Sequence, residues 1–182
     1  GCRAPASLSK ARSARAGFCV ASARVGQTCG MPGTTAWVLA DQLTFSNPAL
    51  DGADRVLMVQ SAGALQAKRF HRQKLHLVLV AMRHFACELE RRGLAVDQVR
   101  AQSLASGLRR HVRCHRPQRV LLMAPKSAAG RATLARLPRV QLLPDAMFLT
   151  DPEEFSRWVA PRGRLVMEDF YRVQRRRLGL LM

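Results

Sequence analysis

The polar residues best placed to bind a ligand follow the first apolar segment of the chain. Asp41 and Gln42, with Leu43 next to them, come directly after the apolar run 36–40. The segment 124–126, Ala-Pro-Lys, follows another apolar run in the same way. A polar ligand needs a few fixed donors and acceptors in an otherwise apolar slot. These residues therefore indicate a binding site, and the alternative is that Asp41 and Gln42 only cap a loop.

The sequence gives no indication of a catalytic arrangement. Asp41, Glu168 and Asp169 are acidic, but neither their spacing nor their neighbours suggest an acid–base pair. The chain has no Gly-x-Gly-x-x-Gly motif, no Walker loop and no motif of the Ser-His-Asp or Cys-His kind. His71 and His84 flank or lie on a predicted helix and are expected to have structural roles. We assign no catalytic residue.

The cysteines do not form a recognisable motif. They are Cys2, Cys19, Cys29, Cys87 and Cys114, and none belongs to a Cys-x-x-Cys pair. They therefore predict neither a metal site nor an iron–sulfur cluster in this chain. Cys87 falls on an apolar helical stripe and is expected in the core. Reduced thiols fit a cytoplasmic location.

The chain is strongly basic, with 30 Lys and Arg against 12 Asp and Glu and a formal net charge of +18. Such a surplus favours polyanions such as nucleic acid, although a general preference for Arg explains part of it. Arg172, Arg175 and Arg176 on the last predicted helix are candidate contacts to DNA phosphates. The alternative is a solvated or interdomain face. No stretch approaches the ~20 apolar residues of a membrane span, so we expect no membrane association.

Apolar runs and helical periodicity alternate along most of the chain. Strands are predicted at 36–40, 55–59, 94–100, 119–124 and 140–144, and helices at 72–92, 103–116, 127–137, 151–160 and 167–178. Residues 1–30 carry five basic residues, no acidic residue and no apolar periodicity. We expect this segment to be a disordered tail, either a transit peptide or sequence upstream of a true start at Met31.

This alternation predicts the topology as well as the elements. Helical crossovers join parallel strands and place helices on both faces of the sheet. Right-handed crossovers then give an α/β fold with a doubly wound, Rossmann-like sheet of five parallel strands. In such sheets a ligand binds beyond the carboxyl ends of the strands, where the strand order reverses. That position is where residues 41–43 and 124–126 are expected.

Four segments in register resemble one protein family over residues 36–182. They are WVLADQL (37–43) followed by NPAL, HRQKLHLVLVAMRHFACEL (71–89), FLTDPEEFSRW (148–158) and MEDFYRVQRRRLGLLM (167–182). Together they resemble the N-terminal α/β domain of the bacterial cryptochromes and photolyases with an iron–sulfur cluster, the deoxyribodipyrimidine photolyase-related proteins. The segment 71–89 is the most specific, because its QKL and AMRHF pieces stand almost unchanged from the family pattern.

The resemblance implies an antenna domain. In that family this domain holds a ribityl-lumazine pigment against a helical domain, which binds FAD and the cluster and carries out light-driven DNA repair. The residues that would contact the pigment are Leu39, Ala40, Asp41, Gln42, Leu43, Gln60 and Lys74. The helical domain is absent from this chain, so we expect no repair by the chain alone. The implied partners are that flavin-binding domain and, through the full-length protein, DNA; the whole protein would act in repair or in light sensing.

The chain departs from the family pattern at three places, all near the expected pigment site. Ala40 stands where the family usually has Gly, and Gln60-Ser61 where an acidic pair is usual. Lys126-Ser127-Ala128 replaces a Trp or another bulky residue. Three alternatives stay open: a free-standing small-ligand-binding module, a basic nucleic-acid-binding fragment and a non-functional remnant of a gene.

Overall fold

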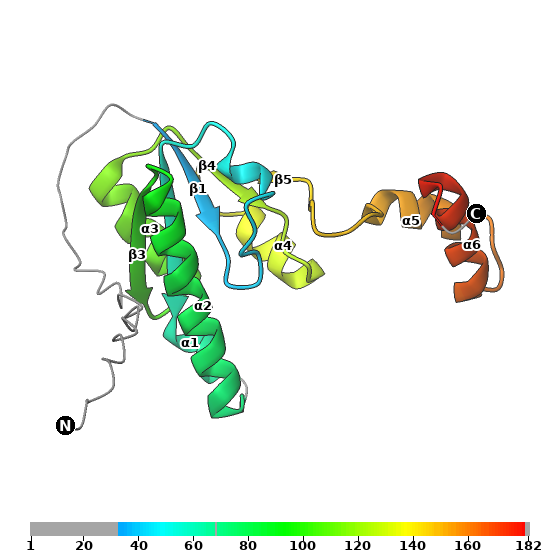
Figure 1. Ribbon diagram of the computed structural model, residues 1–182, viewed down its shortest axis with the longest axis horizontal. Coiled ribbons are helices and arrows are strands. Elements are labelled where there is room, and N and C mark those ends of the chain that lie inside the picture. Colours follow the sequence, from blue (N-terminus) through cyan, green and yellow to red (C-terminus); the bar gives the residue numbers. More distant parts are fainter. Residues whose placement is uncertain (1–32, 68, 181–182) are drawn as a thin grey trace, which may run out of the picture.

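A computed structural model describes residues 33–67 and 69–180, and its main body is a single five-stranded sheet (Figure 1). The strand order is β3-β2-β1-β4-β5, and all neighbouring strands are parallel. The strands are β1 (Thr34–Val38), β2 (Arg55–Ser61), β3 (Ala95–Ala101), β4 (Arg119–Met123) and β5 (Val140–Leu143). The helices are the 3₁₀ turn η1 (Pro48–Leu50), α1 (Ala62–Gln66), α2 (Arg72–Arg91), α3 (Leu104–His115), α4 (Ala128–Ala135), α5 (Pro152–Val159) and α6 (Met167–Leu178).

Helices cover both faces of this sheet. Successive strand residues point to opposite faces, so an apolar run such as 56–59 supplies both cores. The core under α2 contains Ala36, Val38, Val56, Met58, Met82, Phe85, Ala86 and Leu89. The core under α3 and α4 contains Trp37, Leu57, Val59, Val99, Leu108, Val120, Leu122 and Leu134. The predicted doubly wound fold is confirmed.

Two details of the predicted elements are wrong. The first strand covers 34–38 rather than 36–40, because Thr34 and Thr35 are buried and pair with Arg119 and Val120 of β4. The short helix α1 was not predicted, and it begins where the Ser61 hydroxyl accepts a hydrogen bond from the backbone N–H of Ala64. The expectation for residues 1–30 lies outside the described residues, as do Cys2, Cys19 and Cys29.

The ends of the long helices follow the signals in the sequence. Ser103 caps α3 in a reciprocal capping box with Ser106. Asp151 caps α5, with Pro152 at the first turn and Glu153 and Glu154 beside the positive end of the helix dipole. Gly93 follows α2 with φ +87°, a left-handed conformation that glycine adopts without strain.

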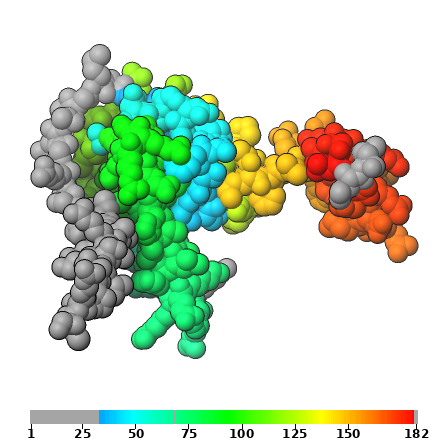
Figure 2. All heavy atoms as spheres, in the orientation of Figure 1, coloured from blue at the N-terminus to red at the C-terminus, as the bar shows by residue number. Residues whose placement is uncertain are grey.

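Helices α5 and α6 form a hairpin that stands apart from the sheet (Figures 1 and 2). Phe155, Trp158 and Phe170 join the two helices, with ring centroids 5.0 to 6.1 Å apart. Arg177 on α6 also pairs with Glu154 on α5. The hairpin therefore has its own small aromatic core.

Within the described part of the chain, none of the helices has both the length and the apolar character needed to cross a membrane.

Candidate functional site

The turn after β1 divides the predicted binding segment between the core and the surface. The backbone N–H of Gln42 donates to the carbonyl of Leu39 at 3.0 Å, which closes the turn. Gln42 is directed inward and is fully buried, whereas Ala40 and Asp41 are exposed. Leu43 packs against the core under α2. The structure therefore places Gln42 in the core and Asp41 beside it at the surface.

Gln42 bridges the carboxyl ends of β1 and β4. Its Nε2 donates to the main-chain carbonyls of Met123 at 2.9 Å and Ala124 at 3.1 Å. These strands lie where the strand order reverses, since β2 and β3 follow on one side of β1 and β4 and β5 lie on the other. The structure thus brings the segments 39–43 and 124–126 together at the switch point, and the Gln42 amide links them.

One atom of Gln42 is unsatisfied. The described part of the chain has three buried side-chain atoms without a hydrogen-bond partner, namely Gln42 Oε1, Trp37 Nε1 and Trp158 Nε1. Of these, only Gln42 Oε1 is an acceptor and lies at the switch point. An unpaired buried polar group costs about 1–3 kcal/mol. A donor from a ligand is one physical explanation for keeping such an atom there.

The remaining predicted pigment contacts, Gln60 and Lys74, lie on β2 and α2. Gln60 is half-buried near the end of β2, the strand beside β1. Lys74 is exposed in the first turn of α2, with its Nζ 5.3 Å from the centroid of the Phe70 ring. Lys126 is also exposed, with its Nζ 5.7 Å from the centroid of the Phe148 ring. Both lysines therefore have a local aromatic neighbour.

The arginines predicted to contact DNA lie on α6, and two of them have local partners. Arg172 forms an ion pair with Glu168 at 3.2 Å. The Nε of Arg175 donates to the carbonyl of Leu180 at 3.4 Å. Arg176 is exposed. This arrangement accords with a solvated helix face and does not single out a nucleic-acid contact.

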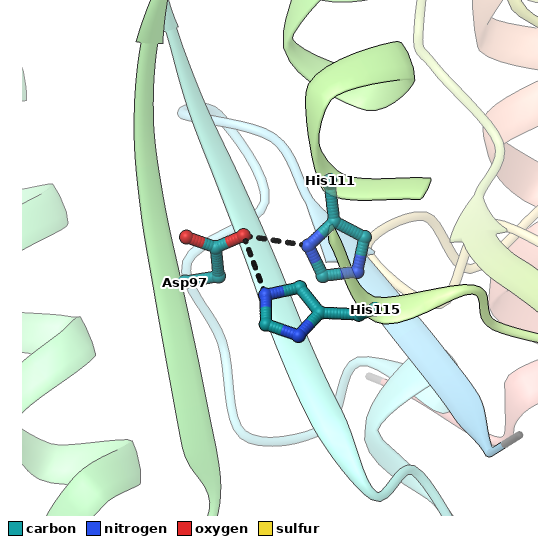
Figure 3. A group of neighbouring side chains, drawn as sticks. All are labelled: Asp97, His111 and His115. Atoms are coloured by element: carbon teal, nitrogen blue, oxygen red, sulfur yellow. Dashed lines mark hydrogen bonds and ion pairs between the residues drawn. The ribbon is translucent and has the colours of Figure 1, made fainter. Parts of the chain in front are cut away.

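A second polar site, which the sequence analysis did not identify, lies between β3 and α3 (Figure 3). His111 is fully buried, and its Nδ1 lies 2.7 Å from Asp97 Oδ2. The other ring nitrogen, Nε2, lies 3.0 Å from the Thr35 hydroxyl. His115 Nε2 approaches the same Asp97 oxygen at 3.4 Å. Two imidazoles therefore converge on one carboxylate oxygen.

Strand register and helix spacing explain this convergence. Asp97 is in register with Leu57, and both point to the α3 face of the sheet. His111 and His115 are four residues apart and so share one face of α3. The helix lies close to the sheet at Gly107, where a Cβ would lie 2.4 Å from Val59 Cγ1.

The protonation of this cluster follows from burial and charge. Burial raises the pKa of Asp97, but the hydrogen bond from His111 and the charges of both histidines and Arg55 outweigh it, so its pKa lies below the ordinary value. Burial and the positive charge of Arg55 lower the pKa of His115 more than Asp97 raises it. At neutral pH, Asp97 is therefore a carboxylate and His115 is neutral.

A signal for this cluster exists in the sequence. An acidic residue interrupts the apolar run 94–99, and the next predicted helix carries His-x-x-x-His at 111–115. Burying a carboxylate without a partner costs free energy. An acidic residue within a predicted strand therefore indicates a partner, and the helix that follows is where that partner is expected. Asp97, His111 and His115 were not among the predicted site residues, because metal ligands were expected only among the cysteines.

The strand order and the helices on both faces define a doubly wound α/β domain, with Gln42 at its switch point. The family of deoxyribodipyrimidine photo-lyase-related proteins matches residues 36–182, and the chain belongs to this family. A protein named (6-4) photolyase, from Agrobacterium fabrum (strain C58), is 32% identical to the chain over 160 residues. The match covers 80% of this chain and 32% of the photolyase, so the chain spans about a third of that relative.

Proposed function

We propose that this chain is the antenna-pigment-binding domain of a photolyase-related protein that acts on DNA in a light-dependent way or senses light. Family membership supports the class of protein. The observation that carries the pigment site is the buried, unpaired Gln42 Oε1 at the switch point of the sheet. The other proposed contacts are Leu39, Ala40, Asp41, Leu43, Gln60 and Lys74.

The residues present fit a ribityl-lumazine. The hydroxyl groups of a ribityl chain can donate to Gln42 Oε1, which has no other described donor. Leu39 and Leu43 offer apolar surface on either side of the turn. Because Gln42 is fully buried, a ligand reaches Oε1 only by displacing part of the turn after β1. Ala40 and Asp41 are the exposed residues of that turn and are the part that would move. The pigment, when bound, supplies absorption of light.

The α5–α6 hairpin and the loops around it present apolar surface that fits a partner domain. The exposed apolar side chains there include Phe148, Leu149, Leu165, Met167 and Tyr171, and Met167 is 76% exposed. Large exposed apolar side chains that lie together mark interaction sites. We propose that a flavin-binding domain, which would hold FAD and the iron–sulfur cluster, packs here. Repair of DNA and a cytoplasmic location are proposed for the whole protein.

Titration of a ribityl-lumazine into the full chain tests the pigment site. We expect saturable binding at one pigment per chain, seen as a change in pigment absorption and fluorescence. Gln42→Leu should weaken binding by up to about tenfold, since a neutral hydrogen bond contributes about 0.5–1.5 kcal/mol. The matched control is Gln118→Leu, an exposed amide at the opposite edge of the sheet. Circular dichroism checks that both variants fold.

Two outcomes would contradict the proposal. One is an absence of saturable binding by the folded chain. The other is equal affinity in the wild type and the Gln42→Leu variant. Binding of unrelated ribityl or nucleotide ligands with the same affinity would instead favour the free-standing ligand-binding module. Salt-dependent DNA binding that is lost on neutralising Arg172, Arg175 and Arg176 would favour the nucleic-acid alternative.

A further inference from the structure

We propose that Asp97, His111 and His115 form a zinc site that fastens the last turn of α3 to β3. The ligand atoms are Asp97 Oδ2, His111 Nδ1 and His115 Nε2, with solvent in the fourth position. The site lies on the α3 face of the sheet, away from the switch point, and is independent of the proposed pigment-binding function.

The spacing of the three atoms is near that of a zinc coordination sphere. Zinc ligands lie about 2.0–2.1 Å from the metal, so two ligands of a tetrahedral site are about 3.4 Å apart. The carboxylate oxygen is 3.4 Å from His115 Nε2 and 2.7 Å from His111 Nδ1, and the three ligand atoms all lie within 4.8 Å of one another. Binding therefore requires the His111–Asp97 pair to separate by less than 1 Å, with the ion replacing the proton between them. It also requires the two imidazole nitrogens, which lie within 4.8 Å of each other, to take up the spacing of the coordination sphere.

The second ring nitrogen of His111 provides independent support. A zinc-bound histidine commonly donates its other N–H to an oxygen, which fixes the ring and raises its basicity. His111 Nε2 already lies 3.0 Å from Thr35 Oγ1 in β1. With the metal on Nδ1, the proton moves to Nε2 and the Thr35 hydroxyl accepts it. The outer partner of the site is thus built into the sheet.

Access and charge are also suitable. The side chains of Asp97 and His115 are 25% and 20% exposed, so an ion can enter from solvent, whereas the fully buried His111 is the inner ligand. A carboxylate and neutral imidazoles are the forms of these side chains that bind a metal ion. The positive charge of Arg55, which lowers the pKa of His115, opposes the cation and limits the affinity of the site.

A zinc ion bound here would hold α3 against β3 and so stabilise the folded chain. Two ligands come from the carboxyl-terminal half of α3 and one from β3, a strand at the edge of the sheet. A zinc ion that binds only the folded chain shifts the unfolding equilibrium in its favour, and more so as its concentration rises. We expect the unfolding temperature to increase with zinc and to fall back on addition of a chelator.

The experiment uses the full chain with Cys2, Cys19, Cys29 and Cys114 changed to Ser, because thiolates also bind zinc. Zinc affinity is measured by competition with a chromophoric chelator, and Co²⁺ serves as a spectroscopic probe of geometry. We expect one ion per chain and a tetrahedral Co²⁺ spectrum. His115→Gln and Asp97→Asn should each weaken zinc binding at least about tenfold, and Thr35→Val, which removes the outer partner, by about tenfold or more.

Two control variants sharpen the experiment. His84→Gln changes an exposed histidine on α2 and should leave zinc affinity unchanged. Arg55→Gln removes the opposing charge and should tighten binding. Equal affinity in wild type, His115→Gln and Asp97→Asn, with all three folded by circular dichroism, would overturn the zinc site, as would an octahedral Co²⁺ spectrum that these substitutions do not alter. The cluster would then be a hydrogen-bonded link and nothing more.

Discussion

Gln42 and His111 are both fully buried polar side chains tied to β1, but they differ in how completely they are satisfied. Near the start of β1, His111 has a partner for each ring nitrogen, Asp97 and Thr35. Beyond the end of β1, the Gln42 amide donates twice from Nε2 while Oε1 has no partner. Both ring nitrogens of His111 are therefore hydrogen-bonded, whereas the Gln42 side chain has one acceptor atom without a partner.

This difference separates two reasons for burying a polar side chain. A group whose donors and acceptors are all paired stabilises the fold and specifies how its elements pack. A group with an unpaired atom weakens the fold by about 1–3 kcal/mol, and such an atom needs another explanation. On this view the His111 cluster belongs to the scaffold and Gln42 to ligand binding. Substitutions at both places test whether this separation holds.

Loss of His111 should have the largest effect on stability. His111→Ala empties a fully buried site, removes the hydrogen-bond partner of the Thr35 hydroxyl and leaves Asp97 with only the longer contact to His115. We expect the free energy of unfolding to fall by about 2–4 kcal/mol, measured by urea denaturation with a chelator present. His84→Ala makes the same change on an exposed part of α2 and should have no measurable effect. A loss as small as that of His84→Ala would show that the cluster does not hold α3 to the sheet.

Thr35→Val should have the next largest effect. Valine has nearly the shape of threonine, so the packing of β1 is kept while His111 Nε2 loses its only described partner. A buried ring nitrogen without a partner should lower the free energy of unfolding by about 1–3 kcal/mol. In a double-mutant cycle, Thr35→Val and His111→Ala should be non-additive because they remove the same hydrogen bond. Additive effects would place Thr35 outside the network.

The sequence was sufficient for the sheet, because a doubly wound fold depends on local patterns. Five apolar runs, each long enough for a buried strand, alternate with helical segments, and parallel pairing follows from the crossovers. The start of β1 was misplaced because Thr34 and Thr35 are polar but buried. Their backbones pair with β4, and their hydroxyl groups have partners in Arg119 and His111. When the hydrogen-bond partner of a polar residue is distant in sequence, its neighbours do not show that the residue is buried in a strand.

The same limit applies to the two polar sites. The meeting of segments 39–43 and 124–126 was predictable, because parallel strands end at one edge. The inward turn of Gln42 and the outward position of Asp41 depend on a turn whose geometry the residue types do not determine. The cluster requires one residue from a strand and two from the following helix. The sequence shows the acidic residue and the His-x-x-x-His spacing, but it does not show that they meet.

Gln42→Leu should reduce stability less than the changes at His111 or Thr35. The substitution removes two hydrogen bonds to the carbonyls of Met123 and Ala124, but it also removes the unpaired Oε1. Because these terms offset each other, we expect a loss of about 1 kcal/mol or less in urea denaturation. A loss as large as that of His111→Ala would mean that Oε1 is satisfied in solution, and the difference between the two sites would disappear.

Asp41→Ala should have the smallest effect on stability and so gives the clearest separation of fold from binding. Asp41 is exposed and lies in the turn after β1, which we propose a ligand displaces to reach Gln42. The substitution should leave the urea midpoint unchanged within error, because it removes no described hydrogen bond, yet it should weaken ribityl-lumazine binding in the titration proposed above. Asp145→Ala, an acidic residue in the loop after β5, controls for the change in net charge. If Asp41→Ala and Asp145→Ala bind the pigment equally, the turn after β1 is not part of the binding site, and the unpaired oxygen of Gln42 must have another cause.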